Sequence, residues 1–68
     1  MKLFRFITGP DDSQFCHRVT AALNKGWLLH GGPAYTFNAA TGTLHCGQAV
    51  VKEVEGVDYT PDIKLGDY

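Results

Sequence analysis

Hydrophobic residues recur with helical spacing in one part of the chain, residues 11–27. Successive members of this set lie three or four positions apart, so they fall on one face of a helix, and polar residues occupy the other positions. The apolar stripe comprises Phe15, Cys16, Val19, Ala22 and Leu23. This pattern predicts an amphipathic helix that packs one face against a sheet.

Both ends of the helix carry capping signals. Asp11 is expected as the N-cap, because its carboxylate can accept hydrogen bonds from the free amides of the first turn, and Gln14 follows at capping-box spacing. Gly26 is expected just after the last helical residue, where glycine readily adopts a left-handed conformation. Trp27 would then turn back onto the last turn of the helix.

Three other segments have the aromatic and β-branched composition of strands. They are residues 2–8, 27–38 and 43–54. The turn signal Gly31–Pro33 interrupts the second segment, which is typical of an edge strand or a bulge. Gly42 is expected to close the loop between the second and third strands.

The order of elements is therefore β-α-β-β, and the fold class is α+β. A helical crossover favours a parallel relation between the first two strands, and the loop at 38–42 makes the third antiparallel to the second. The stretch Cys46–Val51 has no charged residue, which is typical of a strand buried on both faces. We predict one helix on a three-stranded sheet with the third strand in the middle.

Large apolar residues point to both faces of the first strand. Leu3 and Ile7 share one face, and Phe4 and Phe6 share the other. Only one face can lie under the helix, so the other predicts an apolar patch of the kind that marks an interface. Alternatively, the phenylalanine rings fold over the rim of the sheet.

Length and charge narrow the class of protein. At 68 residues the chain makes one domain, expected over residues 1–55, and small domains often need oligomerisation for stability. The tail, residues 56–68, is expected to be mobile or to form an inter-subunit arm. The net charge of −1 and the lack of a basic cluster argue against nucleic-acid and membrane-surface binding.

Cysteine usage and the start of the chain favour the cytoplasm. Two cysteines are too few for a disulfide scaffold, and they are expected to be reduced thiols. Met1 leads directly into a strand that contains Arg5, without the apolar run of a secretory signal. No apolar stretch approaches the length of about 20 residues that a membrane span needs.

The Cys and His residues give no catalytic or metal-binding pattern. The pairs Cys16-His17 and His45-Cys46 lack zinc-ligand spacing, and neighbouring strand residues point to opposite faces. Both cysteines are expected to be buried, whereas a nucleophilic thiol must be exposed. The Gly31–Pro33 segment precedes no helix, so it is no phosphate cradle. We therefore predict no metal, no cofactor and no enzymatic activity.

Aromatic residues of the second strand offer a different chemistry. Tyr35 and Phe37 share one face, and together with Trp27 they could stack a flat aromatic ligand between subunits. In length and element order the chain is similar to the flavin-storing dodecin group. In the simpler alternative, Trp27 is a core residue that closes the helix, while Tyr35 and Phe37 pack against a second subunit.

Several stretches resemble one known family. They are residues 6–11, 15–19, 23–27 and 46–54, together with Pro33 and Phe37. In these the chain is similar to the small bacterial domain-of-unknown-function family 1737, over residues 1 to about 55. The resemblance implies no activity, ligand or catalytic residue. The chain departs from the family pattern at Leu28, where a polar or acidic residue is expected.

The sequence thus favours a non-catalytic module that self-associates, with a dimer as the expected form, or that binds another protein. The alternative is an oligomer that stores or senses a flat aromatic ligand. The candidate interface or ligand-stacking residues are Phe4, Phe6, Trp27, Tyr35 and Phe37.

Overall fold

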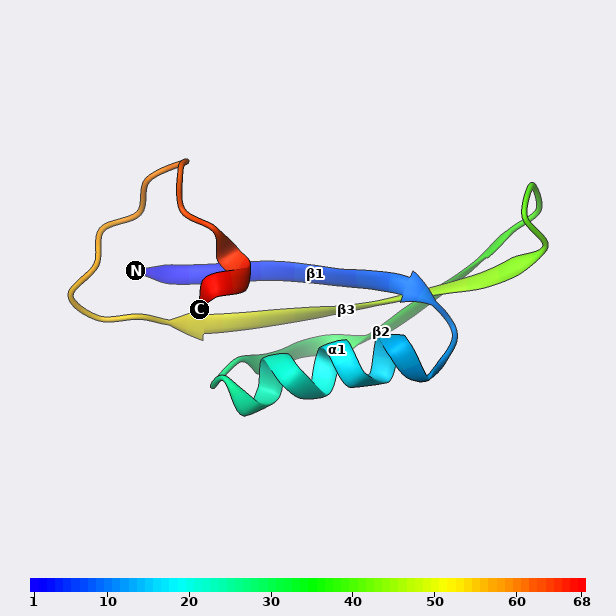
Figure 1. The fold of residues 1–68 in the computed structure, drawn as a ribbon, viewed down its shortest axis with the longest axis horizontal. Coiled ribbons are helices and arrows are strands. Elements are labelled where there is room, and N and C mark those ends of the chain that lie inside the picture. Colours follow the sequence, from blue (N-terminus) through cyan, green and yellow to red (C-terminus); the bar gives the residue numbers. More distant parts are fainter.

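A three-stranded sheet carries one helix on one of its faces (Figure 1). The structure is a computed structural model that describes residues 1–68. Its elements are β1 (Lys2–Pro10), α1 (Ser13–Asn24), β2 (Leu28–Asn38), β3 (Thr43–Glu53) and the short 3-10 helix η1 (Leu65–Asp67). The α+β class and the order β-α-β-β are confirmed.

The strand order is β1-β3-β2, and both outer strands run antiparallel to β3. The first two strands are therefore parallel to each other, and the third is central, as predicted. β1 continues two residues beyond the predicted end, because Gly9 and Pro10 still pair with Cys46 and His45. Pro10 is tolerated there since β1 is an edge strand.

Alternation along β1 decides which of its two apolar faces is covered. Leu3 and Ile7 are 2% exposed and belong to the core with Ala22, Trp27 and Val50. Phe4 and Phe6 point to the other face and stay exposed. The helix therefore covers the aliphatic face of β1 and leaves the aromatic one uncovered.

The helix meets the sheet along a line slightly different from the predicted stripe. Ala22 is buried, and Phe15 and Val19 pack partly buried against the core. Leu23 is 40% exposed and Cys16 is exposed, so the prediction that Cys16 is buried was wrong. The contact line follows the spacing i, i+4, i+7, and residues beside it turn toward solvent.

The helix begins one residue later than predicted. Asp12 is the N-cap, and its Oδ1 accepts from the backbone N–H of Phe15 at 3.2 Å. The N–H of Asp11 instead donates to the carbonyl of Leu44 at 3.0 Å. Asp11 is thus tied to the sheet, and Gln14 is not in capping-box position.

The helix ends as predicted. Gly26 has φ +96°, its N–H donates to the carbonyl of Leu23, and the N–H of Trp27 donates to the carbonyl of Ala22. These two bonds define a Schellman motif. It turns Trp27 back onto Ala22, with which it shares the core.

β2 is an edge strand with the predicted irregularity. Its register with β3 shifts between His30 and Ala34, and Gly31 has φ +72°. The buried side chain of Gln48 donates from Nε2 to the carbonyl of Gly31 at 3.2 Å. This bond satisfies a polar group next to the core and fixes the bulge to β3.

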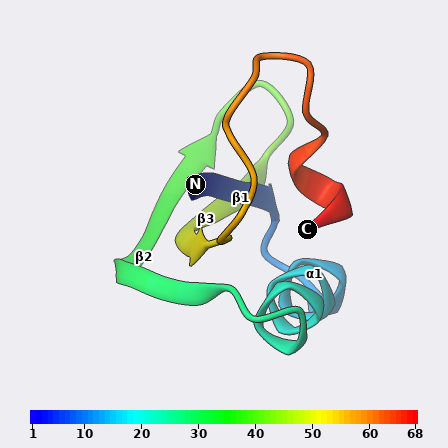
Figure 2. The ribbon, with the colours of Figure 1, turned by 90° about the vertical axis from the view of Figure 1, so that its left-hand side faces the viewer.

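The C-terminal residues lie against the helix side of the sheet. They arch away from β3 and return beside the end of α1 (Figure 2). Ile63, Leu65 and Tyr68 pack against the core, and the Tyr68 carbonyl accepts from Trp27 Nε1 at 3.3 Å and from Lys52 Nζ at 3.1 Å. The sequence did not predict these core contacts, and mobility of the segment stays a prediction.

Candidate interaction surface

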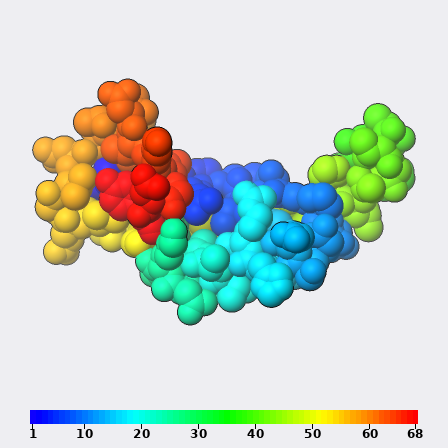
Figure 3. All heavy atoms as spheres, viewed as in Figure 1, coloured from blue at the N-terminus to red at the C-terminus, as the bar shows by residue number.

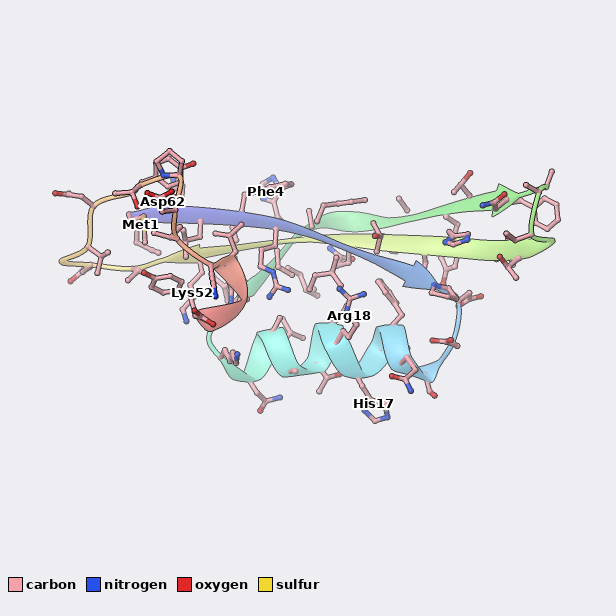
Figure 4. All side chains as sticks on the ribbon, turned by 45° about the horizontal axis from the view of Figure 1, so that its top comes forward. Met1, Phe4, His17, Arg18, Lys52 and Asp62 are labelled. Carbon is pink, nitrogen blue, oxygen red and sulfur yellow. The ribbon has the colours of Figure 1, made fainter.

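The face of the sheet opposite α1, here called the open face, carries no layer of secondary structure. Strand register assigns its side chains, since paired residues point to the same side. Figure 4 shows Phe4 pointing away from the helix, while Arg18 reaches from the helix toward the sheet. The open face comprises Lys2, Phe4, Phe6, Thr8, Pro10, Leu28, His30, Ala34, Thr36, Asn38, Thr43, His45, Gly47, Ala49, Val51 and Glu53.

Large apolar side chains of the open face are well exposed. The exposed fractions are 56% for Phe4, 52% for Phe6 and 67% for Leu28. Phe4 and Leu28 are both paired with Val51 of the central strand, so they flank one half-buried position. Such a continuous apolar patch on a folded chain marks an interaction site rather than scattered surface residues.

Phe6 lies over a glycine of the central strand. A Cβ on Gly47 would be 2.5 Å from Cζ of Phe6, so only glycine leaves room for the ring in this position. Beside the ring is a hollow of ≈ 130 Å³. Its lining residues are Phe6, Thr8, Ala34, Tyr35, Thr36, His45, Cys46 and Gly47.

The open face is nearly free of charge. The sequence from Leu28 to Val51 contains no Asp, Glu, Lys or Arg. The charged residues of the face are Lys2 and Glu53, which are opposite in sign and paired in register at one end. The surface therefore offers no field that would attract a strongly charged partner.

Tyr35 and Phe37 lie on a different surface. They pair with Cys46 and Leu44, whose side chains belong to the helix side of the sheet. β2 and β3 form a hairpin at this end, residues 35–45, here called the hairpin arm, and its residues 37–44 continue beyond the end of β1 as a two-stranded ribbon. Figure 3 shows its tip, in green, projecting from the rest of the molecule.

The aromatic residues of the second strand are therefore not one cluster. Tyr35 is 63% and Phe37 61% exposed, whereas Trp27 is 1% exposed in the core. The guanidinium of Arg5 lies 5.5 Å from the centre of the Trp27 ring on the helix side. Trp27 thus has the core role, and the candidate residues divide between the open face, the hairpin arm and the core.

A comparison with protein families identifies the domain. The family model described as Domain of unknown function (DUF1737) matches residues 1–53. The chain belongs to the DUF1737 family. The match covers α1 and the whole sheet up to Glu53, where β3 ends, so both the open face and the hairpin arm lie within the family domain.

Other comparisons add no relative to this DUF1737 chain. Neither a curated protein nor a solved structure matches it. None of its helices has the length and apolar character required to cross a bilayer.

The Cys and His side chains of the DUF1737 domain do not converge. No three His, Cys, Asp or Glu residues are grouped so that they could hold a metal ion. Figure 4 shows His17 pointing away from the sheet. Cys46 is buried, and its Sγ lies 3.5 Å from the carbonyl oxygen of Gly9. Burial, with a smaller effect from the charge of Asp11, raises the pKa of the Cys46 thiol.

The two thiols should react differently with a thiol reagent. We expect one equivalent, Cys16, to react in the folded protein, and two equivalents to react in denaturant. Cys46 is protected because its side chain is buried, and because its raised pKa lowers the fraction of reactive thiolate. Absorbance of the released chromophore measures both values, and a Cys16→Ser variant identifies the fast thiol. Two fast equivalents in folded protein would contradict the assigned burial of Cys46.

Proposed function

We propose that this DUF1737 domain is a non-catalytic module that associates with a second copy of itself through the open face, in the bacterial cytoplasm. One observation carries the proposal: Phe4, Phe6 and Leu28 are more than half exposed on a single, nearly uncharged sheet face. Two free cysteines without a disulfide support a reducing compartment.

Charge favours a second copy as the occupant. Two copies that meet face to face bring no block of like charges together, because the open face has one base and one acid at the same end. A two-fold pair uses the same patch on both subunits, so the patch must be compatible with itself. The open face of this chain meets that condition.

The size of the face is sufficient for a modest interface. With strands about 4.8 Å apart and about 3.3 Å per residue, three strands of this length present a face of roughly 30 by 14 Å. Two such faces with their side chains bury on the order of 1,000 Å² in total, close to the lower limit for specific complexes. Stacked sheets at about 10 Å separation provide the packing geometry.

Neighbouring leucines on β2 provide a matched test. Leu28 is 67% exposed on the open face, and Leu29 is 56% exposed on the helix side. Leu28→Lys should raise the dissociation constant by roughly 10-fold or more, since burying a leucine contributes about 1.5–3 kcal/mol. Leu29→Lys should leave it within about 3-fold. Sedimentation velocity over a dilution series measures both, and equal effects of the two variants would refute use of the open face.

The hollow beside Phe6 supports a second candidate function. Its size of ≈ 130 Å³ and its lining by the rings of Phe6 and His45 suit part of a flat aromatic ligand. In this case the purified protein should carry an absorbing small molecule that denaturation releases. An absorption spectrum without any band beyond the aromatic side chains would argue against this function.

A further inference from the structure

The outer edge of β2 in the hairpin arm has unpaired backbone groups. Apart from the ladder that pairs β2 with β3, no backbone hydrogen bond involves Ala34–Phe37. An extended strand with an unpaired edge is a template for another strand, because its free N–H and C=O groups lie in register for a partner.

Common protections of a strand edge are absent from this stretch. Charges, prolines and bulges usually protect edges, but the bulge and Pro33 precede Ala34, and Ala34–Asn38 contains neither a charge nor a proline. The other edge of the sheet is better protected. On β1 the Thr8 carbonyl already accepts from Arg18 Nη1 at 2.6 Å, and Pro10 has no N–H to donate.

The arm also needs a third strand. Beyond the end of β1 it is a two-stranded ribbon, in which Phe37 is 61% and Leu44 48% exposed. An isolated two-stranded hairpin is at best marginally stable in water. A strand added to β2 would complete the ladder and shield the aromatic rings.

We propose that two copies of the chain pair through Ala34–Asn38 as antiparallel strands, centred on Thr36. This inference rests on the proposed self-association and adds a contact separate from the open face. Centring on Thr36 places Tyr35 of each copy opposite Phe37 of the other, on the same face of the sheet. Cross-strand aromatic pairs of this kind stabilise a sheet.

The proposed register favours a second copy of the chain as the strand that pairs with the edge of β2. The sequence Ala34–Asn38 is matched to itself when inverted about Thr36, because aromatic residues stand on both sides of the threonine and no charge is opposed to another. A one-residue shift would place Tyr35 and Phe37 opposite Thr36, Ala34 or Asn38 and lose both aromatic pairs, and a two-residue shift would keep only one. The register centred on Thr36 therefore forms the most aromatic pairs.

Cysteine cross-linking tests this register. At the centre of an antiparallel pair the two Cα atoms of residue 36 are about 4.5–5.5 Å apart, within the range of about 4.4–6.8 Å that a disulfide spans. The two copies of residue 34, or of residue 38, are four positions apart in the ladder, about 13 Å. Position 36 should cross-link to itself, whereas positions 34 and 38 should cross-link only to each other.

The experiment compares single-cysteine additions in the full chain with Cys16→Ser as background. After mild oxidation, Thr36→Cys should give at least about 10-fold more covalent dimer than Ala34→Cys or Asn38→Cys alone, because only position 36 meets the distance limit. An equimolar mixture of Ala34→Cys and Asn38→Cys should recover the covalent dimer. Non-reducing electrophoresis and mass spectrometry of the linked peptides measure the result.

The outcomes separate the two proposals. If the parent chain self-associates but position 36 links no better than 34 or 38, the arm pairing is refuted and the open-face proposal stands. If the parent chain is monomeric and no position links, both are refuted. As a second measurement, Phe37→Lys should reduce the yield of covalent dimer from Thr36→Cys about 10-fold, and an unchanged yield would contradict the proposed aromatic pairs.

Discussion

Replacing Trp27 with alanine is expected to unfold the domain at 25 °C. Trp27 is 1% exposed and packs in the five-residue core. A tryptophan-to-alanine change in a core costs about 3–5 kcal/mol, and a core in a chain of this length supplies roughly 3–5 kcal/mol in total. The loss therefore equals the stability that is available.

The same residue connects three parts of the fold. It closes the Schellman motif of α1, its ring lies under the guanidinium of Arg5, and its Nε1 donates to the Tyr68 carbonyl. Removing the ring would thus loosen the helix end and the C-terminal segment together with the core. Circular dichroism during urea denaturation measures the effect without relying on tryptophan fluorescence.

Trp27→Phe is the matched control. It retains most of the ring but loses the indole N–H, so we expect a folded protein destabilised by about 1–3 kcal/mol, through smaller volume and the lost hydrogen bond. A cooperative transition of Trp27→Ala close to that of the parent chain would mean that the core does not depend on Trp27.

The double variant Phe4→Asp, Phe6→Asp is expected to stay folded and to lose association through the open face. Both rings are about half exposed in the single chain, so their replacement removes little of the chain's own core. In a face-to-face pair each subunit would bury two carboxylates without partners, which costs several kcal/mol and exceeds what a small interface can supply. Light scattering measures the mass, and circular dichroism confirms the fold.

Tyr59→Asp provides the control for added charge. Tyr59 is 65% exposed in the segment after β3 and is not one of the open-face residues. The Tyr59→Asp variant should form an assembly of the same mass as the parent chain. An unchanged mass of the Phe4 and Phe6 double variant would show that the open face is not the interface, and an unfolded double variant would show that the rings stabilise the single chain.

The fold was predictable because its signals are local. Three short sequence features each favour one kind of local structure. They are Gly26 after the helical stripe, the Gly31–Pro33 interruption and the uncharged stretch Cys46–Val51. These signals predicted a helix end, a bulged edge strand and a central strand, and the structure has all three. Local conformational preference and tertiary packing agree at these positions.

The errors arose where a long-range contact competes with a local signal. Asp is a residue type favoured at N-caps, but the N–H of Asp11 donates to the carbonyl of Leu44 in β3 and so ties Asp11 to the sheet. Asp12 is the N-cap instead. Cys16 lies beside the helical contact line, and periodicity alone does not tell which neighbouring position faces the sheet.

The candidate surface was predictable only in part. Strand alternation predicted that Phe4 and Phe6 lie on one face of β1 and Leu3 and Ile7 on the other. The structure has this alternation. The separation of Tyr35 and Phe37 from these rings was not predictable, because the bulge after His30 sets the register of the arm. The core contacts of the C-terminal segment depend on Lys52 and Trp27, far away in sequence.

The solution mass of the unmodified chain is the measurement to make first, by light scattering during size-exclusion chromatography, with the absorption spectrum recorded on the same peak. We predict a colourless dimer or larger assembly that dissociates on dilution, because the open face and the edge of the hairpin arm are both exposed in the single chain. A monomer at all concentrations would contradict self-association through either surface.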